Sequence, residues 1–291
     1  MKHSDLVIDA KATLGEGPSW DEEKQLLYWV DIPNFNVHIY NPADNTNRVI
    51  HTSQYVSAVV PRSSGGLIVT MHHGIFSLDP ETEELTPIIN PEADKMDTRF
   101  NDGKCDPVGR LWAGTMAIDE SPGKGALYCL NRDLSVRKML DNISISNGLA
   151  WDEGKEMMYY IDTPNQEVYA FDFELDSGTI RNKRVVINFQ DQEGFPDGMN
   201  IDSEGMLWIA HWGGAKVTRW DPHKGKKVDT VSVAAPRVTS CVFAGENHDE
   251  LYITTARIGM SEKELERYPN AGGVFKVKPG VTGVRTYAFQ G

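Results

Sequence analysis

One short pattern recurs along almost the whole sequence. Its clearest copy lies within residues 195–210, with Asp197 as the residue on which the copies are aligned; a Ser-Glu-Gly turn separates its first part from an apolar run, which predicts two short strands joined by a tight turn. Further copies start at residues 16, 57, 101, 147 and 239, so that successive copies lie 41 to 50 residues apart. This period is typical of propeller blades. The sequence therefore predicts an all-β fold, a six-bladed β-propeller.

The repeats leave no room for a linker, so we expect residues 1–291 to form a single domain. A closed ring must join its first and last blades. We therefore expect the apolar run at residues 6–9 to pair with the strand around Gly273–Val277 and to close the last blade. Residues 118–124 and 256–272 exceed what the repeat needs, and the second segment contains a capping-box pattern, Ser261 to Glu264, that predicts a short helix.

Composition narrows the possible partners. With 29 basic and 42 acidic residues the net charge is −13, which argues against nucleic-acid binding and mildly favours cation binding. The odd number of cysteines predicts no disulfide framework, and we expect Cys105, Cys129 and Cys241 to be small core residues in a reducing compartment. No apolar run is long enough for a signal peptide or a membrane span, so a cytoplasmic location is expected, without membrane association.

The first residue of each copy predicts the chemistry. The innermost strands of a propeller line its central channel, so equivalent positions at their starts form a ring at one mouth. None of the ring residues is apolar: they are Glu16, Ser57, Asn101, Asn147, Asp197 and Thr239. Two carboxylates and two carboxamides in a narrow ring favour a bound cation, and an all-oxygen set suits a hard divalent ion. The alternative is that these residues only cap turns.

Other polar residues near this ring allow more than one interpretation. Arg99 precedes Asn101 by two residues, so it either balances the acidic ring or binds a polar substrate. Asp119 and Glu120 either reach over the mouth or belong to a solvated loop. His211, just beyond the expected second strand of its unit, is interpreted as a hydrogen-bonded turn residue. The aromatic residues of the second strands are expected to pack between blades: Tyr28, Trp112, Tyr159, Trp208 and Tyr252.

Several blocks of the sequence resemble the SMP-30/gluconolactonase/LRE-like family. They cover almost the whole chain, in the right order: Leu14–Pro18, Tyr28–Pro33, Arg99–Lys104, Ala113–Ala117, Ile145–Leu149, Tyr159–Asp162, Pro196–Met199 and Ala271–Lys276. The resemblance implies a six-bladed propeller with one divalent metal in its central channel.

The resemblance also implies roles for individual residues. The metal ligands would be Glu16, Asn147 and Asp197, and Asn101 would be a substrate-side or water-mediated fourth member. Arg99 corresponds to the substrate-binding arginine. Asp119 takes the place of a substrate-contacting glutamate, and its shorter side chain puts the sugar preference in doubt.

Metal-dependent hydrolysis of a small sugar lactone to the aldonic acid is the activity we expect. A divalent ion (Ca²⁺, Zn²⁺, Mn²⁺ or Mg²⁺) would polarise the lactone carbonyl, and Asp197 would act as general base toward the attacking water. Two alternatives remain open: a phosphotriesterase-like hydrolase on the same site, and a calcium-binding regulatory protein without turnover.

Overall fold

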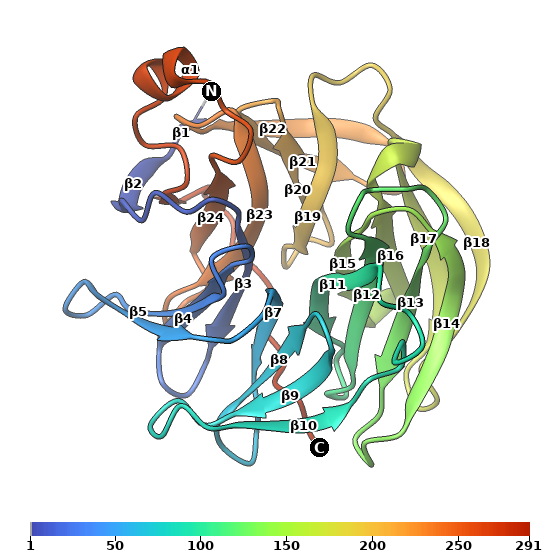
Figure 1. Cartoon of the computed structure of the whole chain (residues 1–291). Coiled ribbons are helices and arrows are strands. Elements are labelled where there is room, and N and C mark those ends of the chain that lie inside the picture. The colour runs from blue at the N-terminus through green and yellow to red at the C-terminus, as the bar shows by residue number, and fades with distance from the viewer. Residues whose placement is uncertain (1) are drawn as a thin grey trace.

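The computed structural model describes residues 2–291, which form short antiparallel sheets around a common centre (Figure 1). Four sheets have four strands each, connected in chain order. They are β3 (Gly15–Asp21), β4 (Leu26–Asp31), β5 (Asn36–Asn41) and β6 (Thr46–His51); β7 (Val56–Pro61), β8 (Leu67–Met71), β9 (Gly74–Leu78) and β10 (Leu85–Ile89); β11 (Thr98–Cys105), β12 (Leu111–Ala117), β13 (Gly125–Leu130) and β14 (Val136–Ile143); and β15 (Ser146–Asp152), β16 (Met157–Asp162), β17 (Glu167–Glu174) and β18 (Thr179–Asn188). Short 3₁₀ turns, η1 (Glu153–Lys155) and η2 (Thr163–Asn165), flank β16.

The remaining strands form one nine-stranded sheet with two parts. One part contains β19 (Phe195–Ile201), β20 (Leu207–Trp212), β21 (Lys216–Asp221), β22 (Lys226–Ser232) and the short β1 (Lys2–His3); the other contains β23 (Arg237–Ala244), β24 (Glu250–Ala256), β25 (Val274–Val277) and β2 (Asp5–Ile8). In the described chain the pairing between β20 and β23 is confined to Trp212 opposite Arg237. The sheet therefore bends here into two units like the other four sheets.

The N-terminal segment is added to these last two units. β2 runs antiparallel to β25, with Leu6 opposite Phe275, which is the pairing expected for residues 6–9. β1 extends the neighbouring unit by pairing parallel to β22. The first strands of successive units contact one another in the order β3, β7, β11, β15, β19 and β23, and β23 contacts β3 again. The arrangement is therefore propeller-like, with these strands innermost.

Apolar side chains fill the spaces between neighbouring units. The five second-strand aromatic residues are almost fully buried, as predicted, and each lies in a cluster that joins two units. Trp208, for example, packs edge-on against Phe243 of the next unit at a centroid distance of 5.8 Å. Aromatic pairs of this geometry add stability beyond the area that they bury.

An aspartate at the end of the first strand anchors several of these units. Asp106 accepts hydrogen bonds from Trp112 Nε1 (2.9 Å) and Arg110 Nε (2.6 Å), and Asp202 accepts from Trp208 Nε1 (2.8 Å). Each carboxylate also accepts backbone N–H groups of its own turn, as Asp106 does from Arg110. The aspartate thus connects the first turn to the buried aromatic residue of the second strand.

Asp106→Ala is expected to destabilise the protein by about 3–5 kcal/mol, because it leaves the buried Arg110 guanidinium without its carboxylate. Urea unfolding followed by tryptophan fluorescence measures the change. Asp172→Ala is the matched control: it removes an ion pair to Arg184 in which both side chains are largely exposed, so little change is expected. Equal losses in the two variants would contradict a special role for the buried pair.

Several local predictions can be compared with the structure. The capping box is present, with α1 (Glu262–Arg267) starting after Ser261. The prediction that His211 lies in a turn beyond the second strand is wrong. His211 lies within β20 and is fully buried, and its Nε2 is 2.6 Å from Thr218 Oγ1. Burial lowers the pKa of His211 to about 4, so it stays neutral at physiological pH.

The three cysteines are buried and free, as core residues would be. No helix in residues 2–291 has the length and apolar character needed to cross a bilayer.

Candidate active site

A cavity of about 360 Å³ opens at the end of the channel where the innermost strands begin. Four of the six ring residues line it: Glu16, Asn101, Asn147 and Asp197. Arg99 lines it as well. The structure therefore brings together the ring residues that were expected to bind metal or substrate, although any two of them are 46 to 181 residues apart in the chain.

 

The other two ring residues have structural roles. Ser57 and Thr239 are fully buried and do not line the cavity. The Thr239 hydroxyl donates to the backbone carbonyl of Gly15 (2.6 Å). It therefore connects the innermost strand β23 to the start of β3 and helps to close the ring.

A β-bulge in each innermost strand aims these side chains. The pairing of β15 with β16 passes from Ser146 directly to Leu149, and that of β19 with β20 passes from Pro196 directly to Met199. Asn147 and Asp197 fall in these gaps. A bulge frees its residues from the regular alternation of a strand and redirects them, which is why bulges occur next to active sites. The repeated pattern thus places a polar side chain in the channel at the same point of each unit.

Tight contact between innermost strands accompanies the bulges. A Cβ added at Gly198, next to Asp197, would lie 2.1 Å from Ser240 Oγ and 2.8 Å from Ser240 Cα. Only glycine lets β19 and β23 approach this closely. This explains why glycine follows the aspartate in the Pro-Asp-Gly-Met block.

A chain of hydrogen bonds orients the two carboxamides. Arg99 Nη1 donates to Asn101 Oδ1 (2.9 Å), and Asn101 Nδ2 donates to Asn147 Oδ1 (3.2 Å). Asn147 Nδ2 in turn donates to Thr163 Oγ1 (2.8 Å), whose hydroxyl donates to the carbonyl of Pro196 (2.8 Å). The chain of bonds therefore ends one residue before Asp197, and it fixes which face of each amide carries oxygen.

Two further aspartates hold the segments that lead into the site. Asp31 accepts the backbone N–H groups of Thr13 and Leu14, both at 3.0 Å. Asp162 accepts the N–H of Ile145 at 2.9 Å. These contacts fix the backbone two residues before Glu16 and two residues before Asn147.

The carboxylates of the site lie in an unfavourable environment for negative charge. Burial, and next the charge of Asp102, raise the pKa of Glu16 to about 8. Burial, followed by the charges of Glu16 and Asp102, raises the pKa of Asp197 well above its ordinary value. Asp102 is itself buried, and burial raises its pKa too, although the nearby Lys104 opposes this. Three buried carboxyl groups in one channel therefore repel one another when ionised.

A divalent cation fits this set of side chains. Asp197 Oδ1 is buried without a hydrogen-bond partner, which is rare unless a ligand or ion takes that place. The other oxygens available are those of Glu16, Asn147 and Asn101, a set typical of hard cations. Residues 2–291 contain no group of three or more His, Cys, Asp and Glu side chains placed to hold a metal. Any metal here would therefore need the carboxamide oxygens as well as the two carboxylates.

Asp119 and Glu120, the two acidic residues expected near the mouth, lie in different surroundings. Asp119 does not line the cavity; it is exposed, and its carboxylate accepts the backbone N–H of Ser121 within its own turn (3.0 Å). Glu120 lines the cavity instead, and its φ of 60° lies in the left-handed region. Arg99 and Glu120 thus place groups of opposite charge in the lining of the same cavity.

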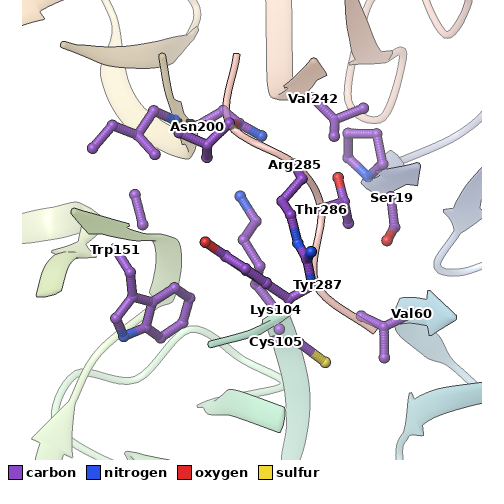
Figure 2. Close-up of a pocket in the computed structure, with 15 residues that line it drawn as sticks. Ser19, Val60, Lys104, Cys105, Trp151, Asn200, Val242, Arg285, Thr286 and Tyr287 are labelled. Carbon is purple, nitrogen blue, oxygen red and sulfur yellow. Dashed lines mark hydrogen bonds between the residues drawn. The ribbon is translucent and has the colours of Figure 1, made fainter. Parts of the chain in front are cut away.

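The far end of the channel holds a second, much smaller cavity of about 40 Å³. Figure 2 shows Arg285, Thr286 and Tyr287 of the C-terminal segment there, together with Lys104. Further along this segment, the backbone N–H of Gln290 donates to the carbonyl of Gly109 (2.9 Å). The C-terminal segment thus crosses the channel at the end opposite the candidate site, which therefore opens at one mouth.

Thr163→Val is expected to weaken metal binding by about 10- to 100-fold, because the variant keeps the shape but loses the hydroxyl that orients Asn147. Calorimetric titration with Mn²⁺ measures the affinity. Thr86→Val, at an exposed position on β10, is the control and should bind as the wild type does. An unchanged affinity in Thr163→Val would show that Asn147 does not depend on this contact.

Fold and site together define the class: a propeller-like protein with an acidic, oxygen-lined cavity at one mouth of its central channel. The family model described as "SMP-30/Gluconolactonase/LRE-like region" matches residues 14–257. The chain therefore belongs to the SMP-30/gluconolactonase/LRE-like family.

Relatives and solved structures of similar extent agree with this assignment. The chain is 43% identical to a putative sugar lactone lactonase, YvrE, of Bacillus subtilis over 98% of both chains, and 39% identical to human regucalcin over 99% of this chain and 98% of that protein. It is similar to a luciferin-regenerating enzyme (TM-score 0.93, 34% identity, 99% of both chains). It is also similar to a calcium-binding regucalcin from Agrobacterium tumefaciens (TM-score 0.95, 26% identity, 99% of this chain and 97% of that one).

Proposed function

We propose that this protein is a metal-dependent lactonase, built as a six-bladed propeller, that hydrolyses sugar lactones to the open hydroxy acids. The observation that carries the proposal is the convergence of Glu16, Asn147 and Asp197 on one cavity, with a buried carboxylate oxygen of Asp197 left without a partner. The ring of innermost strands supports six blades, and the names of the relatives support the reaction class.

Glu16, Asn147 and Asp197 would hold the metal, which is Ca²⁺, Zn²⁺, Mn²⁺ or Mg²⁺. When bound, such an ion supplies Lewis-acid polarisation of the lactone carbonyl. Water adds to the carbonyl carbon, the bond from that carbon to the ring oxygen breaks, and the ring oxygen leaves as a hydroxyl group. Asp197 would accept the proton of the attacking water and pass it to the departing ring oxygen, because a carboxylate that binds a metal through one oxygen can keep the other free.

Arg99, Asn101 and Glu120 are proposed to position the substrate. Arg99 and Glu120 place one positive and one negative group in the lining of the same cavity, where they can donate to and accept from substrate hydroxyls. Asn101 is held between Arg99 and Asn147, so it couples substrate contacts to the orientation of a metal ligand.

A panel of lactones tests the proposal. Metal-stripped protein is refilled with one metal at a time, and acid release is followed with aldono-1,5-lactones, aryl esters and organophosphate triesters. Faster turnover of lactones than of the other two classes is expected with at least one metal. Preferred hydrolysis of the triesters would instead indicate a phosphotriesterase-like enzyme. Tight Ca²⁺ binding without turnover of any substrate would indicate a calcium-binding regulatory protein, and either result would overturn the proposed activity.

A further inference from the structure

The cavity is polar at its base and apolar around much of its mouth. Glu16, Asn101, Asn147 and Asp197 come from the innermost strands, at or directly before the interruptions of their pairing, whereas the apolar lining comes from strand ends and loops. The apolar residues are Leu14, Met116, Ile145, Pro164, Phe195 and Trp212. Apart from Glu16 and Asp197 at the base, the charged residues that line the cavity are Arg99 and Glu120.

Phe195 and Trp212 are the two aromatic residues of this apolar lining. They lie directly opposite each other in the pairing of β19 with β20. Phe195 precedes Asp197 by two residues, which places it roughly 7 Å further along the strand toward the mouth. Phe195 is 44% exposed, which is unusual for a large aromatic residue and leaves its ring available to a ligand.

Trp212 is held in place by a segment that the repeat does not need. The Arg237 guanidinium lies 5.3 Å from the centre of the Trp212 ring, a cation–π distance. Arg237 also donates to the carbonyl of Gly259 (3.1 Å), which belongs to the extra segment at residues 256–272. These contacts fix the position of Trp212, which together with Phe195 forms what we call the apolar wall.

We propose that the preferred sugar lactones have an apolar substituent on the saturated ring carbon bonded to the ring oxygen, and that Phe195 and Trp212 determine this specificity. The inference rests on the proposed lactonase activity. With the lactone carbonyl at the carboxylate base, the rest of the ring extends toward the mouth, and a substituent of a few carbons on it would contact Phe195. A fully hydroxylated chain at the same place would set hydroxyl groups against apolar walls that cannot accept or donate hydrogen bonds.

A matched series of lactones tests this specificity: δ-valerolactone, δ-hexalactone and δ-octalactone, which differ only in an absent, methyl or propyl substituent. In the wild type kcat/KM is expected to rise by up to about fourfold for each carbon added, and at least tenfold across the series. In Phe195→Ala the rise should fall below threefold. Val228→Ala, at an exposed position on β22, is the control and should keep the wild-type rise.

The possible results separate the two proposals. A flat or falling series in the wild type, or an undiminished rise in Phe195→Ala, overturns the specificity proposal. Faster turnover of glucono-1,5-lactone than of its 6-deoxy analogue, which has the same ring hydroxyls but a methyl substituent, also overturns it and indicates that the aromatic rings stack on a sugar instead. If no lactone is hydrolysed, the proposed function fails, and the wall is then tested by calorimetry with the corresponding δ-lactams. About tenfold tighter binding of the propyl lactam than of the unsubstituted one, lost in Phe195→Ala, supports the wall, and equal binding overturns it.

Discussion

Asp197→Asn is expected to lower kcat/KM for lactone hydrolysis by about 10³-fold or more. The substitution keeps the size of the side chain but removes the carboxylate that is proposed to accept a proton and to bind the metal. Loss of a general base alone costs about 10²- to 10⁴-fold. Initial rates of acid release on metal-saturated protein measure the effect.

A loss of folding can be separated from this loss of chemistry. Asp197 is buried beside Glu16 and Asp102, and their charges oppose its ionisation, so a neutral amide should leave the metal-free protein at least as stable as the wild type. Thermal unfolding checks this point. Asp141→Asn, on an exposed side chain, is the control for a carboxylate lost elsewhere. Activity of Asp197→Asn within tenfold of the wild type would rule out the proposed role.

Removal of the metal is expected to reduce activity by about a thousandfold or more, because the polarisation of the carbonyl is lost with it. Chelator treatment followed by dialysis, with rates measured before and after metal is restored, tests this expectation. Restored metal at a hundred times its Kd should also stabilise the fold by about 2.7 kcal/mol and raise Tm by roughly 4 °C. Full activity of protein shown by elemental analysis to hold no metal would contradict the proposal.

This stabilisation should depend on pH in a defined direction. In the metal-free protein the pKa of Glu16 is raised from 4.5 to about 8, so between these values the folded state holds a proton that the unfolded chain releases. The stability of the metal-free protein therefore falls as pH rises through this window. A cation removes the cause of that fall, so the rise in Tm on adding metal should be larger at pH 8 than at pH 5.5. Glu16→Gln should weaken binding and reduce this pH dependence, and a Tm rise independent of pH in the wild type would contradict the assignment.

The phase of the repeat was enough to find the base of the cavity. Glu16, Asn101, Asn147 and Asp197 occupy equivalent points of their units. Asn101, Asn147 and Asp197 fall where the strand pairing is interrupted, and Glu16 lies directly before such an interruption. A regular feature of the fold thus fixes these residues, and a regular feature is visible in a sequence.

Residues that depend on irregular backbone could not be found in this way. Glu120 rather than Asp119 lines the cavity because a turn closed by Asp119 and Ser121 decides which side chain faces inward. Asp102 follows Asn101 directly, and simple alternation along a strand would point only one of them into the channel. Both fall between Phe100 and Gly103, where the pairing is interrupted. The contact of Thr163 with Asn147 joins the end of one strand to the start of another, and no spacing in the sequence indicates it.

The most direct test is an anomalous-scattering map from crystals of this protein soaked with Mn²⁺. The proposal predicts one strong peak in the channel, about 2.0–2.6 Å from side-chain oxygens of Glu16, Asn147 and Asp197. The peak should be lost in crystals of Asp197→Asn or Glu16→Gln. A channel without a peak in protein that hydrolyses lactones, or a peak held by other residues, would contradict the proposed metal centre.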